Sequence, residues 1–237
     1  MTAHVNIDQY PVEPYWEESE SVEKEAGIDS SASQDIHAYV RRRLDSWRVY
    51  HFHDTGSFSP MERTADMDDN RFLRPDGSNL SAFLYFLRVR HEVYYNLVIQ
   101  TVRQVAPFFE DFILELDRLS TDKIRLEWRH VGTDAYFDAS SLSDGTLRFI
   151  ALATLFLQPE SLRPSVILVD EPELGLHPYA ITLLASLMKQ ASVQTQVIVS
   201  TQSSLLLDHF EPEDILVADR INGGTQLTRL NSADLES

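Results

Sequence analysis

The sequence lacks cysteine, contains only eight glycines in 237 residues and has no long apolar run. Without cysteine, disulfide bonds and thiolate metal sites are excluded, which favours a reducing, cytoplasmic compartment. The longest apolar stretch, FIALATLFL at 149–157, is less than half of the ~20 residues that a membrane-spanning helix needs. We therefore expect a buried helix there and no membrane partner.

Positive charge is also scarce. Lysine and arginine total 20 against 37 acidic residues, for a net charge of −17. Such a field repels phosphate and argues against a protein that coats nucleic acid. Residues 1–35 are strongly acidic, whereas the following segment is richer in arginine, so any DNA-binding surface is expected there; a solvated helix face of mixed charge is the simpler alternative. These arginines are Arg41, Arg42, Arg43, Arg48, Arg63, Arg71, Arg74, Arg88, Arg90 and Arg103.

The remaining composition suits a globular α/β protein, because a hydrophobic fraction of 43% is enough to fill a core. Three regions are expected. Residues 1–35 form an acidic, loosely ordered lead-in, residues 36–139 a helical linking subdomain, and residues 140–237 an α/β core.

In the middle region, β-forming residues at 46–54 and alternation at 123–129 predict two strands. Between them, apolar residues at helical spacing predict one long helix from Asn79 to Pro107.

The last region alternates between strand and helix patterns. Strands are predicted for 165–170, 195–201 and 214–219, with one helix opening at Pro178 and a short one over 203–210. This order predicts βαβ units and a parallel sheet.

Four short motifs follow one another in this region. LSDG at 142–145 precedes the apolar helix, whose free N–H groups and dipole would face an anion. The apolar run of VILVDE ends in Asp170-Glu171, LGLH follows at 174–177, and VIVSTQS at 197–203 delivers polar residues to the end of the next strand. Ligands of parallel sheets collect at that edge.

In order and spacing, these motifs resemble the carboxyl-terminal half of an ABC-type ATPase head, as in RecF-like and SMC-like proteins and the bacterial proteins called AAA family ATPases. The resemblance implies a partial P-loop NTPase fold, a parallel sheet core flanked by helices with a helical subdomain. Leu142 to Gly145 are similar to the signature motif, with Asp144 where transporters usually carry glycine. Asp170-Glu171 are similar to the Walker B pair and Leu174 to His177 to the D-loop.

The resemblance also implies roles around ATP and Mg²⁺. Asp170 would hold Mg²⁺ through water, and Glu171 would orient the attacking water. Ser143 and the N–H groups around Gly145 would contact a nucleotide held by a second subunit, with Asp144 and His177 beside it. Gln202 stands where many relatives place a histidine, and its amide cannot carry a proton as histidine does.

No segment fits the phosphate loop G-x-x-x-x-G-K-[ST], because no glycine precedes a lysine. We therefore expect a head without its amino-terminal lobe, either a truncated reading frame or half of a split protein, and nearly inactive alone. In such sheets the strand at 195–201 normally lies between the Walker B and Walker A strands, so here it should form an exposed edge.

The leading hypothesis is an ATPase head that works as a homodimer or with a partner chain supplying Walker A, in DNA repair or defence against foreign DNA. A second hypothesis is a non-catalytic module that completes a partner's nucleotide site. A third reading takes His51, His53 and Asp54 as transition-metal ligands, although alternation with Tyr50 and Phe52 is more typical of a half-buried strand.

Overall fold

The structure, a computed structural model, describes residues 41, 44, 47–55, 59–116, 120, 122–221 and 223–232. The chain divides into two compact units, residues 1–45 and 46–237. The lead-in expected at 1–35 lies outside the described residues, and the division expected at 139–140 stays a prediction.

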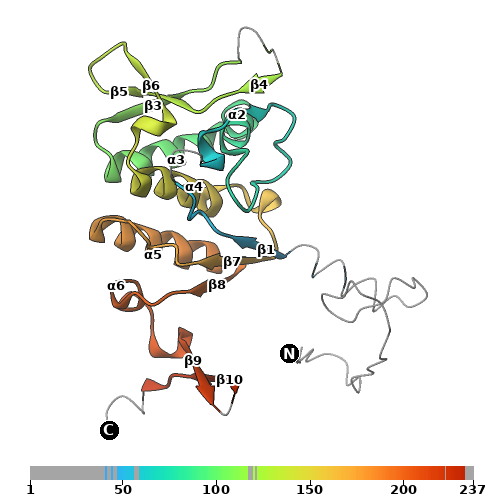
Figure 1. The fold of residues 1–237 in the computed structure, drawn as a ribbon, viewed down its shortest axis with the longest axis vertical. Helices are drawn as coiled ribbons and strands as arrows, with labels where there is room; N and C mark the ends of the chain where they lie inside the picture. The colour runs from blue at the N-terminus through green and yellow to red at the C-terminus, as the bar shows by residue number, and fades with distance from the viewer. Residues whose placement is uncertain are drawn as a thin grey trace, which may run out of the picture. The chain divides into compact units, whose positions relative to one another are not determined.

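The larger unit contains a parallel sheet of three strands (Figure 1). Its order is β1 (Trp47–Tyr50), β7 (Val166–Asp170), β8 (Gln196–Ser200), with Tyr50 opposite Val169 and Asp170 opposite Ser200. Because the strands are parallel, their carboxyl ends meet at one edge. The α/β fold with a parallel sheet, and the positions of these three strands, are as the sequence predicted, except that β1 ends before His51.

Within the described part of the chain, β8 pairs only with β7 and is therefore an edge strand, as expected. Val197 and Val199 are half-buried, whereas Ile198 between them is 42% exposed. An apolar side chain beside unpaired main-chain groups is a site for association with another strand.

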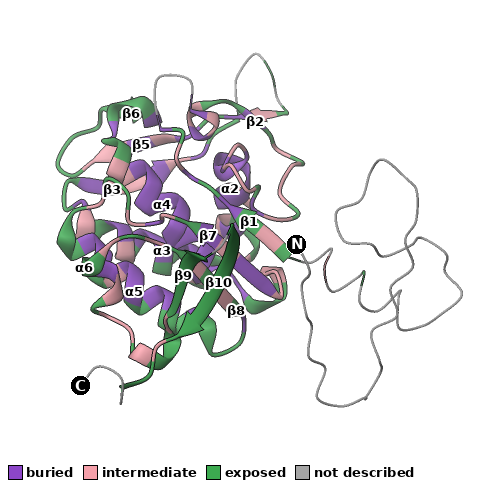
Figure 2. Cartoon of the chain, turned by 60° about the horizontal axis from the view of Figure 1, so that its bottom comes forward, coloured by how far each residue is buried: buried purple, intermediate pink, exposed green. Residues whose placement is uncertain are grey.

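Helix α4 lies at the centre of the core. Every residue of α4 (Asp144–Leu157) from Leu147 onward is buried, which confirms the predicted buried helix. Helix α4 packs against both α3 (Glu92–Val105) and α5 (Pro178–Ser192). Figure 2 shows the buried residues of α4 in purple.

The helices are α2 (Leu80–Arg90), α3 (Glu92–Val105), α4 (Asp144–Leu157), α5 (Pro178–Ser192) and α6 (Ser204–Leu207), with short 3₁₀ turns η1 (Pro60–Glu62), η2 (Ala139–Ser141), η3 (Glu160–Leu162) and η4 (Pro212–Asp214). No helix among the described residues is long and apolar enough to cross a membrane.

The single helix predicted from Asn79 to Pro107 is wrong, because the chain breaks into α2 and α3 at His91. His91 leaves the helical region, with φ −139° and ψ 49°. Its ring contacts Phe86 edge-on at 5.3 Å and Tyr94 at 6.3 Å between centroids. The change of direction therefore packs one ring from each helix against His91.

The single strand predicted at 123–129 is also divided. β4 (Lys123–Ile124) pairs with β2 (Ala65–Asp66), whereas β5 (Glu127–His130) lies between β3 (Phe109–Ile113) and β6 (Tyr136–Asp138) in a separate antiparallel sheet. Ile124, Leu126 and Trp128 are all buried. The alternation of buried and exposed side chains is as predicted, but it continues across a change of partner strand.

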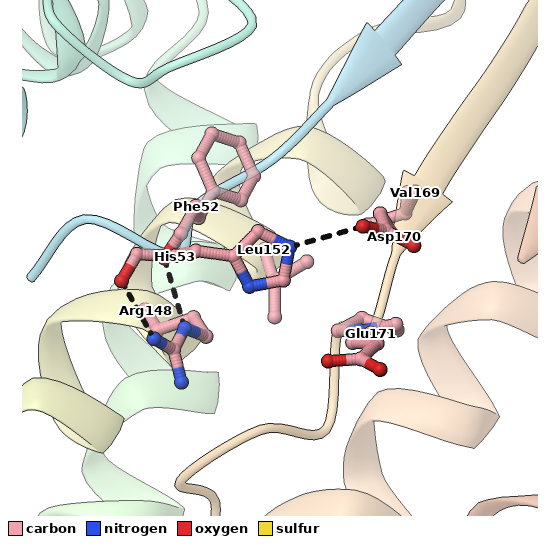
Figure 3. A pocket seen from close by; sticks show the side chains of 8 residues that line it. Phe52, His53, Arg148, Leu152, Val169, Asp170 and Glu171 are labelled. Carbon is pink, nitrogen blue, oxygen red and sulfur yellow. Dashed lines mark hydrogen bonds and ion pairs between the residues drawn. The ribbon is translucent and has the colours of Figure 1, made fainter. Parts of the chain in front are cut away.

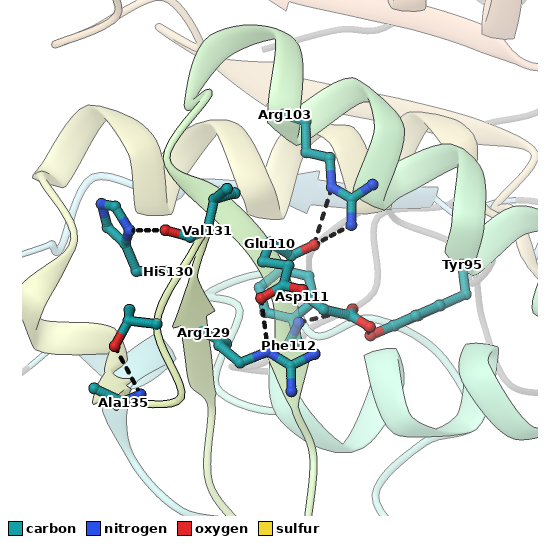
Figure 4. A network of polar contacts seen from close by, with 10 residues as sticks. Tyr95, Arg103, Glu110, Asp111, Phe112, Arg129, His130, Val131 and Ala135 are labelled. Carbon is teal, nitrogen blue, oxygen red and sulfur yellow. Dashed lines mark hydrogen bonds and ion pairs between the residues drawn. The ribbon is translucent and has the colours of Figure 1, made fainter.

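A polar network joins this antiparallel sheet to α3 (Figure 4). The Tyr95 hydroxyl donates to Asp111 Oδ1 at 2.7 Å, and Arg103 Nε donates to the Glu110 carbonyl at 2.9 Å. Arg129 Nε pairs with Glu110 Oε2 at 2.8 Å. Burial, and then the bond to Asp111, raise the pKa of Tyr95, so its hydroxyl stays a donor.

The third strand predicted for the parallel sheet, at 214–219, is wrong in its pairing. β9 (Leu216–Ile221) instead forms an antiparallel hairpin with β10 (Gly224–Arg229), and every residue of both strands is exposed. Asn-Gly at 222–223, a strong hairpin signal, lies between the strands in the sequence, and Gly223 has φ +85°.

Candidate functional site

The site is built at the carboxyl edge of the parallel sheet. Asp170 ends β7, Ser200 ends β8, and the Ser200 hydroxyl donates to Asp170 Oδ1. The Asp170 side chain remains 56% exposed. One carboxylate oxygen is therefore fixed by the neighbouring strand while the group stays open to a ligand.

His53 approaches Asp170 from the other side (Figure 3). Its Nε2 lies 3.4 Å from Asp170 Oδ2, within ion-pair distance if the ring is protonated. That nitrogen is shielded from solvent, yet its geometry satisfies no hydrogen bond with any described residue. His53 Nε2 therefore faces Asp170 Oδ2 without a hydrogen bond between them.

The metal reading for His51, His53 and Asp54 finds no support. The described residues contain no group of three or more His, Asp or Glu side chains placed to share a metal ion, and His51 is exposed. His53 instead lines a narrow pocket with residues of two other segments, α4 and the end of β7 with the turn after it. The pocket is lined by Phe52, His53, Arg148, Leu152, Val169, Asp170, Glu171 and Pro172.

Glu171 has a backbone conformation that L-residues rarely adopt. Its φ is +38°, and its N–H donates to the Ser200 carbonyl at 2.9 Å. A left-handed residue other than glycine costs about 1 kcal/mol or more and concentrates at functional sites. The left-handed conformation of Glu171 turns the chain sharply after β7, so that Asp170 and Glu171 both lie at the sheet edge.

The turn that follows is tied to the end of β8. The Thr201 hydroxyl donates to Glu173 Oε1, while Glu173 Oε2 is buried without a partner among the described residues. Thr201 Oγ1 also accepts from the Ser203 amide at 2.9 Å. Gln202, between these two residues, is exposed.

His177 ends this turn and begins α5. Its Nδ1 accepts from the Tyr179 amide at 3.3 Å, which caps the helix, and Pro178 occupies the first turn. The structure therefore gives His177 a local structural role, and the nucleotide contact implied by the resemblance stays a prediction.

Ser143 and Gly145 lie at the start of α4. The Ser143 hydroxyl accepts from the Thr146 amide at 3.2 Å as the helix cap, and Asp144 is the first helical residue. A Cβ on Gly145 would come closer to the Gly175 carbonyl oxygen than the 3.0 Å that real Cβ atoms keep. The helix start therefore packs main chain to main chain against the turn after Glu171, which brings two of the predicted motifs into contact.

Arg148, one turn further along α4, was not singled out from the sequence. Only 5% of the Arg148 surface is exposed to solvent. Its guanidinium donates to the carbonyls of Phe52, His53 and Leu174. Burial lowers the pKa of Arg148 from its usual value, and nearby Asp144 opposes that shift. Even lowered, an arginine pKa leaves the group charged.

Three neighbours of the predicted site were missed: Ser200, Glu173 and Arg148. Ser200 had a usable signal, because it ends a strand adjacent to β7. The other two act through contacts between distant segments, which a local pattern does not reveal.

The parallel sheet with two acids at its carboxyl edge and helices packed against it is an α/β fold of the kind found in ABC-type ATPase heads. The chain belongs to the family described as "AAA domain, putative AbiEii toxin, Type IV TA system", whose model matches residues 10–208. A search of curated proteins found no significant match.

Solved structures of SMC heads share this fold. The SMC head bound to the C-winged helix domain of ScpA superposes with a TM-score of 0.53 at 19% identity, covering 76% of this chain and 53% of that one. Our chain thus spans about half the length of that head. The SMC head with a coiled coil and joint from Pyrococcus yayanosii gives 0.49 at 20% identity, covering 65% and 29%. A structure from a study of ATP-driven dimerization and DNA-stimulated activation of SMC ATPases gives a TM-score of 0.48 at 20% identity, covering 64% of this chain and 91% of that one.

Proposed function

We propose that this chain is the carboxyl-terminal part of an ATP-hydrolysing head of RecF-like type, whose phosphate loop comes from another segment or chain. The supporting observation is the convergence of Asp170, Glu171 and the Ser200–Thr201 strand end at one edge of the sheet. Family membership and fold support an ATP-binding domain.

The residues present fit the groups that such a head uses. The exposed Asp170 carboxylate offers oxygen, which Mg²⁺ prefers, and would hold the ion through water. Bound Mg²⁺ would neutralise charge on the phosphates of ATP. Glu171, next along the chain and turned by its positive φ, would orient the attacking water.

The remaining predicted residues have assigned places in this proposal. Ser143, Asp144 and Gly145, at the positive end of α4, would face a nucleotide held by a second copy or a partner chain. Gln202 would contact the terminal phosphate through its amide, and His177 would lie beside it at the start of α5.

We also propose that this head acts in DNA repair or in defence against foreign DNA. Arg74 pairs with Asp69, while Arg88 and Arg103 donate to the carbonyls of Leu114 and Glu110. Three of the arginines considered for phosphate contact are therefore engaged within the protein.

The first test is calorimetric titration of the chain with Mg²⁺-ATP, with Asp170→Ala as the control. We expect no binding, because no phosphate loop is present in the sequence. Micromolar binding that Asp170→Ala abolishes would overturn the half-site proposal, since the chain would then hold phosphate by itself.

The alternative is a non-catalytic module that completes a partner's nucleotide site. The Glu171→Gln variant, measured in a complex with a chain that carries the phosphate loop, distinguishes this alternative from the ATPase proposal. A catalytic Glu171 predicts a loss of turnover of about a hundredfold or more. Unchanged turnover assigns the chain to the module.

A further inference from the structure

Arg148 is a buried cation that the proposed chemistry does not use. Nε donates to the Phe52 carbonyl at 2.9 Å, Nη2 to the His53 carbonyl at 3.2 Å, and Nη1 to the Leu174 carbonyl. None of the ion pairs found in the described part of the chain includes it. Its hydrogen-bond donors therefore serve main-chain carbonyls.

Figure 3 shows His53 on one side of the pocket and Asp170 and Glu171 on the other. Phe52-His53 continues from β1 and places the His53 ring 3.4 Å from Asp170. Leu174 belongs to the turn that begins with the strained Glu171. One side chain thus connects both walls of the acidic edge to α4.

The same turn is locked to α4 by a second, independent contact. Gly145 packs against the Gly175 carbonyl with no space for a Cβ, and a Cβ on Gly175 would lie 3.0 Å from Arg148 Nη1. Displacing the turn would therefore disturb both the start of α4, where Ser143 lies, and the guanidinium of Arg148.

We propose that Arg148 is a positioning residue, which fixes the separation between His53 and the Asp170–Glu171 turn and couples both to the start of α4. The inference rests on the proposed function for the identity of the site, but its geometry does not involve ATP. An arginine is required because its planar fork carries five donors, whereas lysine has one nitrogen and cannot reach three carbonyls on two segments.

Amide hydrogen exchange of the full chain tests this inference, with Arg148→Lys and Arg148→Met. We expect exchange in 52–55 and 172–177 to rise about tenfold in Arg148→Met, the effect of losing hydrogen bonds to a charged donor. Arg148→Lys should protect one of these segments and not both. The ring-proton resonances of His53 should shift in Arg148→Met.

Arg163→Met is the matched control. Arg163 is also partly buried, and its Nε donates to the carbonyl of Gln158 at the other end of α4, at 3.0 Å. It should leave both segments and His53 unchanged. A uniform rise through β7 and α4, no rise, or the same pattern in Arg163→Met would each overturn the proposal. Arg148→Lys keeps the charge and supplies the test if Arg148→Met does not fold. Since neither readout uses nucleotide, failure here is distinct from failure of the calorimetric test.

Discussion

The N–H of Glu171 donates to the carbonyl of Ser200 at 2.9 Å, while Glu171 itself is held at φ +38°. The neighbouring strand thus keeps an acidic residue in a conformation that suits glycine. We expect Glu171→Gly to be more stable than Glu171→Ala by about 1 kcal/mol, because glycine removes the strain at modest entropic cost.

Urea unfolding of both variants measures this difference. The control is the pair Glu173→Gly and Glu173→Ala, in the same turn but without a positive φ, for which alanine should be the more stable. Equal stability of the two Glu171 variants would show that the backbone there carries no strain.

Gly145→Ala should destabilise the chain by about 2 kcal/mol, because the added methyl group meets the main chain of Gly175. This cost opposes the higher helix propensity of alanine. Gly224→Ala is the control, since its Cβ would make an ordinary contact with the Ile221 carbonyl at 3.7 Å. Thermal melts compare the two, and a Gly145→Ala protein as stable as the parent would contradict the close packing.

The edge of β8 should make the isolated chain self-associate as its concentration rises. Ile198→Lys places a charge on that edge and should shift the chain toward monomer in sedimentation velocity. Val193→Lys changes a residue that is 81% exposed at the end of α5 and should have no effect. A parent chain that stays monomeric and melts cooperatively at every concentration would refute the prediction.

Glu127 lies directly opposite Asp138 across β5 and β6. Burial first, and then Asp138, raise the pKa of Glu127 above 4.5. A raised carboxyl pKa favours the folded state below the unfolded pKa, and this stability is lost as pH rises through the folded pKa. At pH 7 Glu127→Gln should therefore be more stable than the parent by about 0.5 kcal/mol.

Urea unfolding of both proteins at pH 7 and pH 4 tests the predicted direction of this pH dependence. The advantage of Glu127→Gln should shrink at the lower pH, where the parent carboxyl takes up its proton. Glu110→Gln is the contrast, because it removes the 2.8 Å pair with Arg129 and should not stabilise the chain at pH 7. An advantage for Glu127→Gln that is equal at both pH values would rule out charge as its cause.

The parts of the fold that sequence predicts well are those whose cause is local. Continuous apolar runs define β7 and the buried α4, and the acids after the first run fall at the sheet edge because parallel strands share that edge. The motifs that adjoin these elements in the sequence are therefore placed correctly once the elements are.

The errors have causes outside the local pattern. His91 interrupts a helical period without proline or glycine, because its ring packs between Phe86 and Tyr94. After Ile124 the chain changes from pairing with β2 to pairing with β3, but the alternation of buried and exposed residues continues unbroken. The sequence pattern therefore does not reveal the change of partner strand. Arg148 bonds a carbonyl 96 residues earlier in the chain, a contact that no short window contains.

The hairpin of β9 and β10 has apolar side chains such as Leu216, Ile221 and Leu227 in the open, with no residue of either strand buried. Two isolated strands gain little stability in water. A segment that packs into no core can exchange its side chains at little cost to folding. The exposed faces of β9 and β10 can therefore change in sequence while the parallel sheet, and the acidic edge it carries, stay folded.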